Sequence, residues 1–288
     1  MKKCLNCNFL YLSNNFTCPK CNYTPNNICK FPAFAPELNK SNNGFETDFH
    51  DQLYTIEDQH FWFNYRNILI GYFFNKYFPL ARSFCEIGCG SGYVLAGLHA
   101  RRPDIEYTAS EIYSNALTLA ASRVPDARFF QADICNFPFE SEFDVIGVFD
   151  VLEHIEDDSK ALKNIFKALV PGGGVILTVP QHEWLWSELD MVACHKRRYS
   201  QQSITRKLAE TGFTIQRMTS FMSLLMPMML FSRYIVNHLK KKHDPIDELQ
   251  VSKKFTPLFL KICALEKKMI QQNLDFPFGG SLLCIATK

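Results

Sequence analysis

Two acidic residues follow short apolar runs in the first half of the chain, where parallel strands of a sheet would end. Glu86 precedes a turn with three glycines, and Glu111 follows the next apolar run. Gly88, Gly90 and Gly92 let the backbone approach a ligand at positions where a Cβ would collide. A carboxylate at the second strand end can accept hydrogen bonds from two ribose hydroxyls. This pattern predicts an α/β sheet that binds a nucleoside.

The glycine spacing separates two classes of nucleoside ligand. The dinucleotide pattern requires a third glycine at the position of Tyr93, because a diphosphate must lie against the helix N-terminus. Gly92 comes one position too early for this pattern. Glu86 would also repel a diphosphate and attract a cation. The residues therefore favour a ligand with a ribose, no phosphate and a positively charged amino end, and S-adenosylmethionine is such a ligand.

Four spaced motifs, at 84–92, 110–112, 131–134 and 149–154, resemble those of the class I S-adenosylmethionine-dependent methyltransferases. The resemblance covers roughly 61–213. It implies cofactor contacts from residues of all four motifs: Glu86, Gly88, Gly90, Gly92, Glu111, Asp133, Ile134 and Phe149. For Glu86 and the glycines the alternative is an ordinary strand-to-helix turn, and for Asp133 it is a helix cap.

Alternating strand and helix patterns predict a Rossmann-like α/β fold with a seven-stranded, doubly wound, mostly parallel sheet. The expected strands are 83–87, 106–110, 128–132, 144–149, 175–179, 213–218 and 281–287. In the resembled family the last two strands form an antiparallel pair at one sheet edge. The Pro-Gly-Gly-Gly sequence at 171–174 is expected to separate a helix from the fifth strand. Ser200 and Gly212 are expected to bound a later helix.

Four cysteines near the amino terminus form a second chemical signal. Cys4 and Cys7 make one close pair, and Cys18 and Cys21 make another. Each pair can present two thiolates to one tetrahedral ion, and the spacing is that of a zinc ribbon. A redox pair or an iron site is the alternative. A segment this short buries too little apolar surface to fold alone, so Zn²⁺ would supply its folding free energy.

These signals divide the chain into four parts. We expect a zinc-ribbon-like module at 1–30, a linker at 31–59, the cofactor-binding domain at 60–218 with 281–288, and a helical lid insertion at 219–280. An aromatic helix that begins near His60 is expected to be buried on more than one face. The resemblance implies that this helix closes over the cofactor. Its Arg66 would then meet the methionyl carboxylate through a bidentate pair, with a surface ion pair as the alternative.

The insertion is apolar and rich in methionine over 221–231, and a second amphipathic helix starts at Thr256. We expect a lid over the substrate, because methionine-lined surfaces adapt to variable ligands. One alternative is a pair of helices that only covers the sheet. Another is peripheral contact with a membrane surface through 221–242, since the apolar run is too short for a transmembrane segment.

Methyl transfer requires alignment, exclusion of water and, for an oxygen acceptor, removal of a proton. His154 follows the fourth strand and is one candidate base, unless it only bonds to the backbone. Glu153 is expected to be a helix N-terminal charge. His195 is the second candidate base, within a basic run at 194–200 that the resemblance places near the substrate. The alternative for this run is a solvated face or a set of ion pairs with Glu188 and Asp190. The sequence does not rank the two histidines.

The net charge of +2 over 288 residues gives no general attraction to nucleic acid or to an anionic membrane. Eleven cysteines and an amino terminus unlike a signal peptide indicate a cytoplasmic protein. The favoured function is methylation of a small-molecule or lipid- or glycan-linked acceptor at oxygen or carbon. An RNA methyltransferase that binds nucleic acid through the zinc module is the second interpretation. The third is a cofactor-binding interaction protein without turnover. The ribbon has few basic residues, which weighs against RNA.

Overall fold

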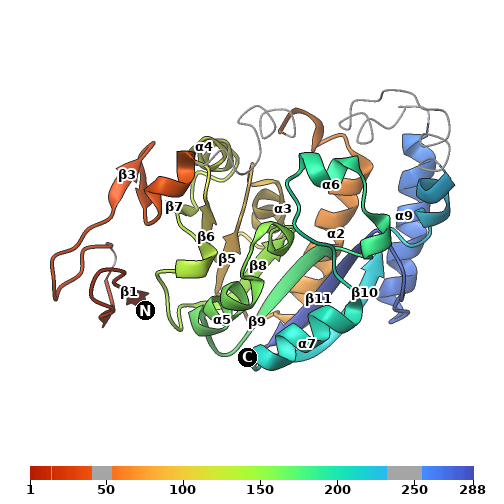
Figure 1. Cartoon of the computed structure of the whole chain (residues 1–288). Coiled ribbons are helices and arrows are strands. Elements are labelled where there is room, and N and C mark those ends of the chain that lie inside the picture. Colours follow the sequence, from red (N-terminus) through yellow and green to blue (C-terminus); the bar gives the residue numbers. More distant parts are fainter. Residues whose placement is uncertain (14, 41–53, 232–254) are drawn as a thin grey trace.

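The computed structural model describes residues 1–13, 15–40, 54–231 and 255–288 (Figure 1). Its strands are β1 Lys2–Lys3, β2 Leu10–Tyr11, β3 Asn26–Ile28, β4 Phe31–Ala33, β5 Ser83–Ile87, β6 Glu106–Glu111, β7 Arg128–Gln131, β8 Phe143–Phe149, β9 Leu169–Pro180, β10 Thr214–Phe221 and β11 Ser281–Thr287. Its α-helices are α2 Phe61–Tyr77, α3 Tyr93–Arg101, α4 Ser114–Arg123, α5 Asp158–Ala168, α6 Glu188–Val192, α7 Gln201–Thr211 and α9 Thr256–Gln271. Short 3-10 helices are η1 Pro36–Lys40, η2 Ile134–Asn136, η3 Leu152–His154 and η4 Glu183–Leu185.

One sheet organises the domain, with strand order β10-β11-β9-β8-β5-β6-β7-β4-β3 among the described residues. Strands β7, β6, β5, β8 and β9 are parallel, whereas β11 runs antiparallel to both β9 and β10. Alternate side chains enter two apolar cores, one shared with α2, α3, α4 and α9 and the other with α5 and α7. The predicted α/β fold, the mostly parallel sheet and its antiparallel last strand are confirmed.

The sheet is wider than predicted, because β3 and β4 add two strands beyond β7. Ala33 of β4 pairs with Gln131 of β7. The Gln131 side chain also donates to the Ala35 carbonyl at 2.6 Å and accepts from its backbone N–H at 3.0 Å. The prediction of an irregular linker is therefore wrong for residues 31–40, and residues 41–53 of that segment lie outside the described residues.

Strand β9 begins earlier than predicted, directly after α5 ends at Ala168. The 171–174 sequence lies inside the strand and does not separate it from the helix. The reason is close packing: a Cβ on Gly174 would lie 2.4 Å from the Phe78 ring and 2.7 Å from the Ala286 carbonyl. These glycines therefore let β9 pass between its neighbours. The bounds predicted for β5 and β11, and the capping of α7 by Ser200 and Gly212, match the structure.

The amino-terminal hairpin of β1 and β2 packs against the end of the sheet that carries β3 and β7 (Figure 1). The Lys3 amide donates to the Pro138 carbonyl at 2.9 Å, and the Glu140 amide donates to the Met1 carbonyl at 2.9 Å. The Phe16 ring lies 5.0 to 6.1 Å from three phenylalanine rings of the sheet domain. The hairpin is thus attached to the domain by backbone hydrogen bonds and aromatic contacts.

Helix α9 packs along α2 (Figure 1). One buried carboxylate joins the two helices to the segment that follows β10. Glu266 accepts hydrogen bonds from the Tyr65 hydroxyl at 2.9 Å and from the amides of Met222 and Leu224 at 2.8 Å each. For α9 this arrangement corresponds to a helix that covers the sheet. Residues 232–254 of the predicted lid, and with them half of the predicted membrane-contact segment, lie outside the described residues. Across the described part of the chain, no helix has the length and apolar character needed to cross a membrane.

Candidate active site

The turn between β5 and α3 combines three glycines with positive φ angles of 71°, 50° and 77°. A Cβ on Gly88 would lie 2.4 Å from a Val151 methyl group, and one on Gly92 would lie 2.8 Å from Ala120. Packing therefore explains these two glycines. A Cβ on Gly90 would meet no atom within 4 Å, so the backbone here borders open space. Gly90 is where a ligand can lie against the main chain.

Glu111, at the end of β6, lies directly beside this open position. One carboxylate oxygen accepts from the Gly90 amide at 2.9 Å, and the other accepts from the Ile112 amide at 2.7 Å. A carboxylate has about four acceptor positions, so Glu111 retains acceptor capacity. The backbone thus holds this side chain at the edge of the space over Gly90.

Glu86, at position four of β5, is buried among apolar residues with 2% of its surface exposed. Its Oε2 has no hydrogen-bond partner among the described residues. Burial raises the pKa of Glu86 to about 8. A cationic ligand would provide the partner that the carboxylate lacks, which fits the amino end of S-adenosylmethionine.

Arg66, on the buried helix α2, forms an ion pair with Asp150 at the end of β8. Its guanidinium also stacks over the Trp62 ring at 4.6 Å. The Asp150 backbone has a φ of 56° and donates to the Thr178 carbonyl at 2.9 Å. Arg66 is therefore partnered within the chain, and its contact with a methionyl carboxylate stays a prediction.

The remaining predicted cofactor residues also follow strand ends at the carboxyl edge of the sheet. Asp133 accepts from the Cys135 amide at 2.8 Å and caps η2, which is the alternative role considered for it. Ile134 and Phe149 are 4% and 5% exposed and pack in the two apolar cores, so their contact with the cofactor stays a prediction.

The two candidate bases lie together. The ring centroids of His154 in η3 and His195 after α6 are 4.8 Å apart. Glu153, which belongs to η3, has no exposed surface, and neither of its carboxylate oxygens has a hydrogen-bond partner among the described residues. Burial raises its pKa well above the ordinary value. Glu153 lies in the first turn of η3, the position expected for a helix N-terminal charge, but its side chain is buried in the interior.

Asp190 of α6 holds the second histidine in place. Its Oδ1 lies 2.8 Å from His195 Nδ1, and it makes two hydrogen bonds of 2.8 and 2.9 Å with the Arg198 guanidinium. Burial alone would raise the pKa of Asp190, but the hydrogen bonds from His195 and Arg198 hold it well below its usual range. Asp190 is therefore a carboxylate that positions His195.

The basic run at 194–200 is attached to the elements around the histidines by an ion pair and by hydrogen bonds. Arg197 pairs with Asp158 at 3.2 Å, and the buried Tyr199 hydroxyl donates to Asp158 at 2.8 Å and to the Leu152 carbonyl at 3.1 Å. These contacts tie the segment to η3 and α5. The ion-pair alternative is thus the observed arrangement for Arg197 and Arg198.

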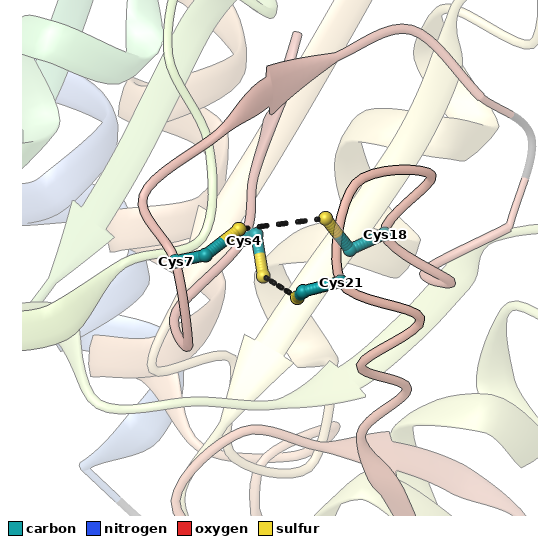
Figure 2. Close-up of side chains that lie close together, drawn as sticks. All are labelled: Cys4, Cys7, Cys18 and Cys21. Atoms are coloured by element: carbon teal, nitrogen blue, oxygen red, sulfur yellow. Dashed lines mark hydrogen bonds between the residues drawn. The ribbon is translucent and has the colours of Figure 1, made fainter.

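The four cysteines converge at the amino-terminal hairpin (Figure 2). The Sγ atoms of Cys4 and Cys21 are 3.6 Å apart, and those of Cys7 and Cys18 are 3.7 Å apart. A tetrahedron with Zn–S bonds of 2.3 Å has edges of about 3.8 Å, so the thiols already have the spacing that the ion requires. The geometry fits one four-coordinate metal ion.

The two cysteine turns have the same backbone conformation. Asn8 and Asn22 have φ angles of 58° and 56°. Their amides donate at 2.9 Å to the carbonyls of Cys4 and Cys18. Each turn therefore presents its two thiols in the same way, as the repeated sequence spacing predicts.

Comparison with known proteins identifies the family. A family model described as a methyltransferase domain matches residues 31–217. The chain belongs to this family. An uncharacterized methyltransferase, YdaC, from Bacillus subtilis is 31% identical over 104 residues, which cover 35% of this chain and 58% of the relative. Trans-aconitate 2-methyltransferase from Escherichia coli is 30% identical over 100 residues, which cover 35% and 39%. The chain thus spans less than two thirds of these relatives.

Solved methyltransferase structures share the fold at low identity. Phosphoethanolamine N-methyltransferase 2 of Haemonchus contortus, in complex with S-adenosyl-L-methionine, superposes with a TM-score of 0.53 and 19% identity. The alignment covers 77% of this chain and 52% of that one. A possible histamine N-methyltransferase from Thermotoga maritima gives a TM-score of 0.54 at 15% identity, with coverage of 84% and 95%. These likenesses concern the fold.

Sequence reasoning placed the glycine turn and Glu111 of this methyltransferase domain and the four cysteines that precede the domain. It did not predict how three acidic residues are buried and paired. Asp150, Glu153 and Asp190 decide the electrostatics around the two histidines. Their only sequence signal is acidic residues beside histidine or arginine, which surface ion pairs also produce.

Proposed function

We propose that the protein is an S-adenosylmethionine-dependent methyltransferase that acts on a small-molecule or lipid- or glycan-linked acceptor, at oxygen or carbon. The observation that carries this proposal is the open position over Gly90, bordered by the Glu111 carboxylate, together with a buried Glu86 whose Oε2 has no partner among the described residues. The family match supports methyl transfer. The relatives named for trans-aconitate and phosphoethanolamine support a small acceptor.

The chain's own residues fit this cofactor at several points. Glu111 would accept hydrogen bonds from the ribose, and the Glu86 carboxylate would attract the ammonium group. Asp133, Ile134 and Phe149 would line the adenine position. When bound, the cofactor supplies an activated methyl group on a sulfonium.

The acceptor is expected at the other side of β8, where His154 and His195 meet. Since Asp190 binds His195 through Nδ1, the Nε2 atom is the one that faces the site. We propose that one of these two histidines accepts the proton that the methyl acceptor loses. Trp184, Trp186 and Met191 are 60%, 39% and 60% exposed on the neighbouring segment, which supports an acceptor with an apolar part.

We further propose that the four cysteines bind one structural Zn²⁺ ion. The thiol spacing and the small core of the hairpin, Cys4, Tyr11 and Cys18, support a metal-stabilised module. The attachment of the hairpin to the sheet domain favours a structural role over nucleic-acid binding.

Calorimetry with purified protein tests the cofactor assignment. S-adenosylmethionine and S-adenosylhomocysteine should bind with micromolar affinity, about −8 kcal/mol, while NADH should not bind. Labelled methyl should then appear in small-molecule, lipid or glycan fractions. Binding of NADH in place of both compounds would overturn the proposal. Label found only in RNA would overturn the acceptor class, and bound cofactor with no labelled product would indicate a binding protein.

A further inference from the structure

We propose that Glu153, His154 and His195 form a binding site for a divalent transition-metal ion beside the acceptor position. One carboxylate oxygen and one nitrogen of each ring all lie within 4.8 Å of one another. Two imidazoles and one carboxylate are a ligand set suited to Mn²⁺, Fe²⁺, Co²⁺ or Zn²⁺. This site is separate from the four-cysteine cluster.

The orientation of His195 leaves a lone pair aimed at Glu153. The carboxylate of Asp190 already accepts two hydrogen bonds from Arg198, so the nearby Nδ1 of His195 carries the proton and donates. In the neutral ring Nε2 carries a lone pair, and it lies 3.9 Å from Glu153 Oε1. A cation can bind both atoms when it replaces the proton of the buried carboxyl group.

A carboxylate that bonds the far nitrogen of a metal-binding histidine is a recurrent arrangement, because it fixes the ring and makes the near nitrogen a better ligand. Asp190 occupies this place relative to His195. Arg198 fixes Asp190 in turn through its two hydrogen bonds. Asp190 and Arg198 therefore hold the His195 ring in a fixed orientation, as the residues around a metal site do.

The burial of Glu153 is a second, independent reason to propose a metal site. It has no exposed surface, and both its oxygens lack hydrogen-bond partners in the part of the chain that the structure describes. A buried carboxylate without partners costs several kcal/mol unless a proton or a cation compensates it.

The charges near Glu153 favour a cation. Arg66 and Arg198 both act on Glu153, but each is already paired, with Asp150 and Asp190 respectively. Both arginines are thus compensated by other carboxylates, which leaves the Glu153 side chain available as a ligand for the ion.

The role of the ion rests on the proposed function. Three protein ligands leave open coordination positions, which an acceptor oxygen can occupy. With the ion bound, the two histidines act as its ligands in place of their role as bases, because a hydroxyl bound to a divalent ion loses its proton to solvent more readily. The site therefore points to an oxygen acceptor and away from a carbon acceptor.

Mn²⁺ is the selective probe, because it prefers oxygen and nitrogen ligands over thiolates. Full-length protein would first receive one equivalent of Zn²⁺ to occupy the cysteines, and free Mn²⁺ would then be followed by electron paramagnetic resonance. We expect about one Mn²⁺ per chain. His195→Ala and Glu153→Gln should weaken binding at least tenfold, and Asp190→Asn about 10–100-fold. His99→Ala, a histidine on α3 that packs against Tyr107, is the matched control and should bind as the parent does.

The effect of Mn²⁺ on the unfolding temperature is a second measurement of binding, which applies even if a variant is less stable. Mn²⁺ should raise the unfolding temperature of the parent protein but not that of Glu153→Gln, which has nearly the same shape. The inference is overturned if neither Mn²⁺ nor Co²⁺ binds outside the cysteine cluster of folded parent protein. It is also overturned if Glu153→Gln binds Mn²⁺ as the parent does.

The two proposals fail separately. Calorimetric binding of S-adenosylmethionine without any Mn²⁺ binding removes the metal site and leaves the methyltransferase. Mn²⁺ binding without any binding of S-adenosylmethionine retains the metal site but removes its assigned role.

Discussion

Arg66 on α2 forms an ion pair with Asp150, the residue that directly follows β8. This pair joins the helix before the first central strand to the turn that carries Glu153 and His154. The two side chains are only 10% and 20% exposed, so the pair is largely shielded from water. Asp150 also contributes to the raised pKa of Glu153, after burial. Helix α2 and the turn that carries Glu153 and His154 are therefore electrostatically coupled.

Removing Arg66 should destabilise the protein and disturb the cofactor site together. Arg66→Ala leaves Asp150 without its partner, which we expect to cost up to about 3 kcal/mol of unfolding free energy. Affinity for S-adenosylmethionine should fall about tenfold. Urea unfolding and calorimetry measure the two effects.

Arg206→Ala is the matched control, because Arg206 is 72% exposed and only 4.0 Å from Glu210 on the same helix. It should change stability by less than about 0.5 kcal/mol. Equal effects of the two substitutions would contradict the buried role of Arg66.

Glu111→Gln tests the ribose contact. Glutamine keeps the size of the side chain but removes the charge and one acceptor oxygen, so affinity for S-adenosylmethionine should fall about 10–100-fold. Glu106→Gln, at the exposed start of the same strand, should bind as the parent does. Unchanged calorimetric affinity of Glu111→Gln would show that the ligand does not use this carboxylate.

Cys18→Ser tests the metal-stabilised hairpin. Loss of one thiolate from a four-cysteine site should remove close to one equivalent of Zn²⁺ per chain and lower the unfolding temperature. Metal content by mass spectrometry and thermal unfolding measure both changes. Cys29→Ser changes an exposed cysteine outside the cluster and should alter neither. Full zinc content in Cys18→Ser would contradict the assignment.

The sequence predicted features whose physical cause is local. Strand β11 is an apolar run from Leu282 to Ala286, and the Cys4 and Cys18 turns repeat one short spacing. Helix α7 carries its own boundary signals in Ser200 and Gly212. In each of these cases neighbouring residues are sufficient to specify the conformation.

The features that sequence reasoning missed depend on distant partners. Strand β4 is three residues long. It forms because Ala33 pairs with Gln131 of β7 and the Ala35 amide donates to the Gln131 side chain. Glu153 is far from His195 in the chain and approaches it only when the segment after α6 packs beside η3. No local pattern distinguishes such carboxylates from ordinary surface charges.

Glu86 should make the stability of the ligand-free protein depend on pH. Its pKa rises from 4.5 to about 8 on folding, because burial disfavours the charged form. Below pH 4.5 the group is protonated in both states and costs nothing. Between pH 4.5 and about 8 the unfolded chain releases the proton while the folded chain retains it, so stability falls as pH rises, by up to about 1.4 kcal/mol per unit. Above pH 8 the full cost remains.

Glu86→Gln isolates this contribution, because glutamine is neutral at every pH. Urea unfolding at pH 5.5, 7 and 8.5 should give a variant whose stability, relative to the parent, increases steadily with pH. S-adenosylmethionine should recover stability for the parent at pH 8.5 by pairing with the ionised carboxylate, and much less for the variant. Glu106→Gln should follow the parent at every pH, since that side chain is 75% exposed. A stability difference between Glu86→Gln and the parent that stays constant from pH 5.5 to 8.5 would show that Glu86 does not hold its proton in the folded protein.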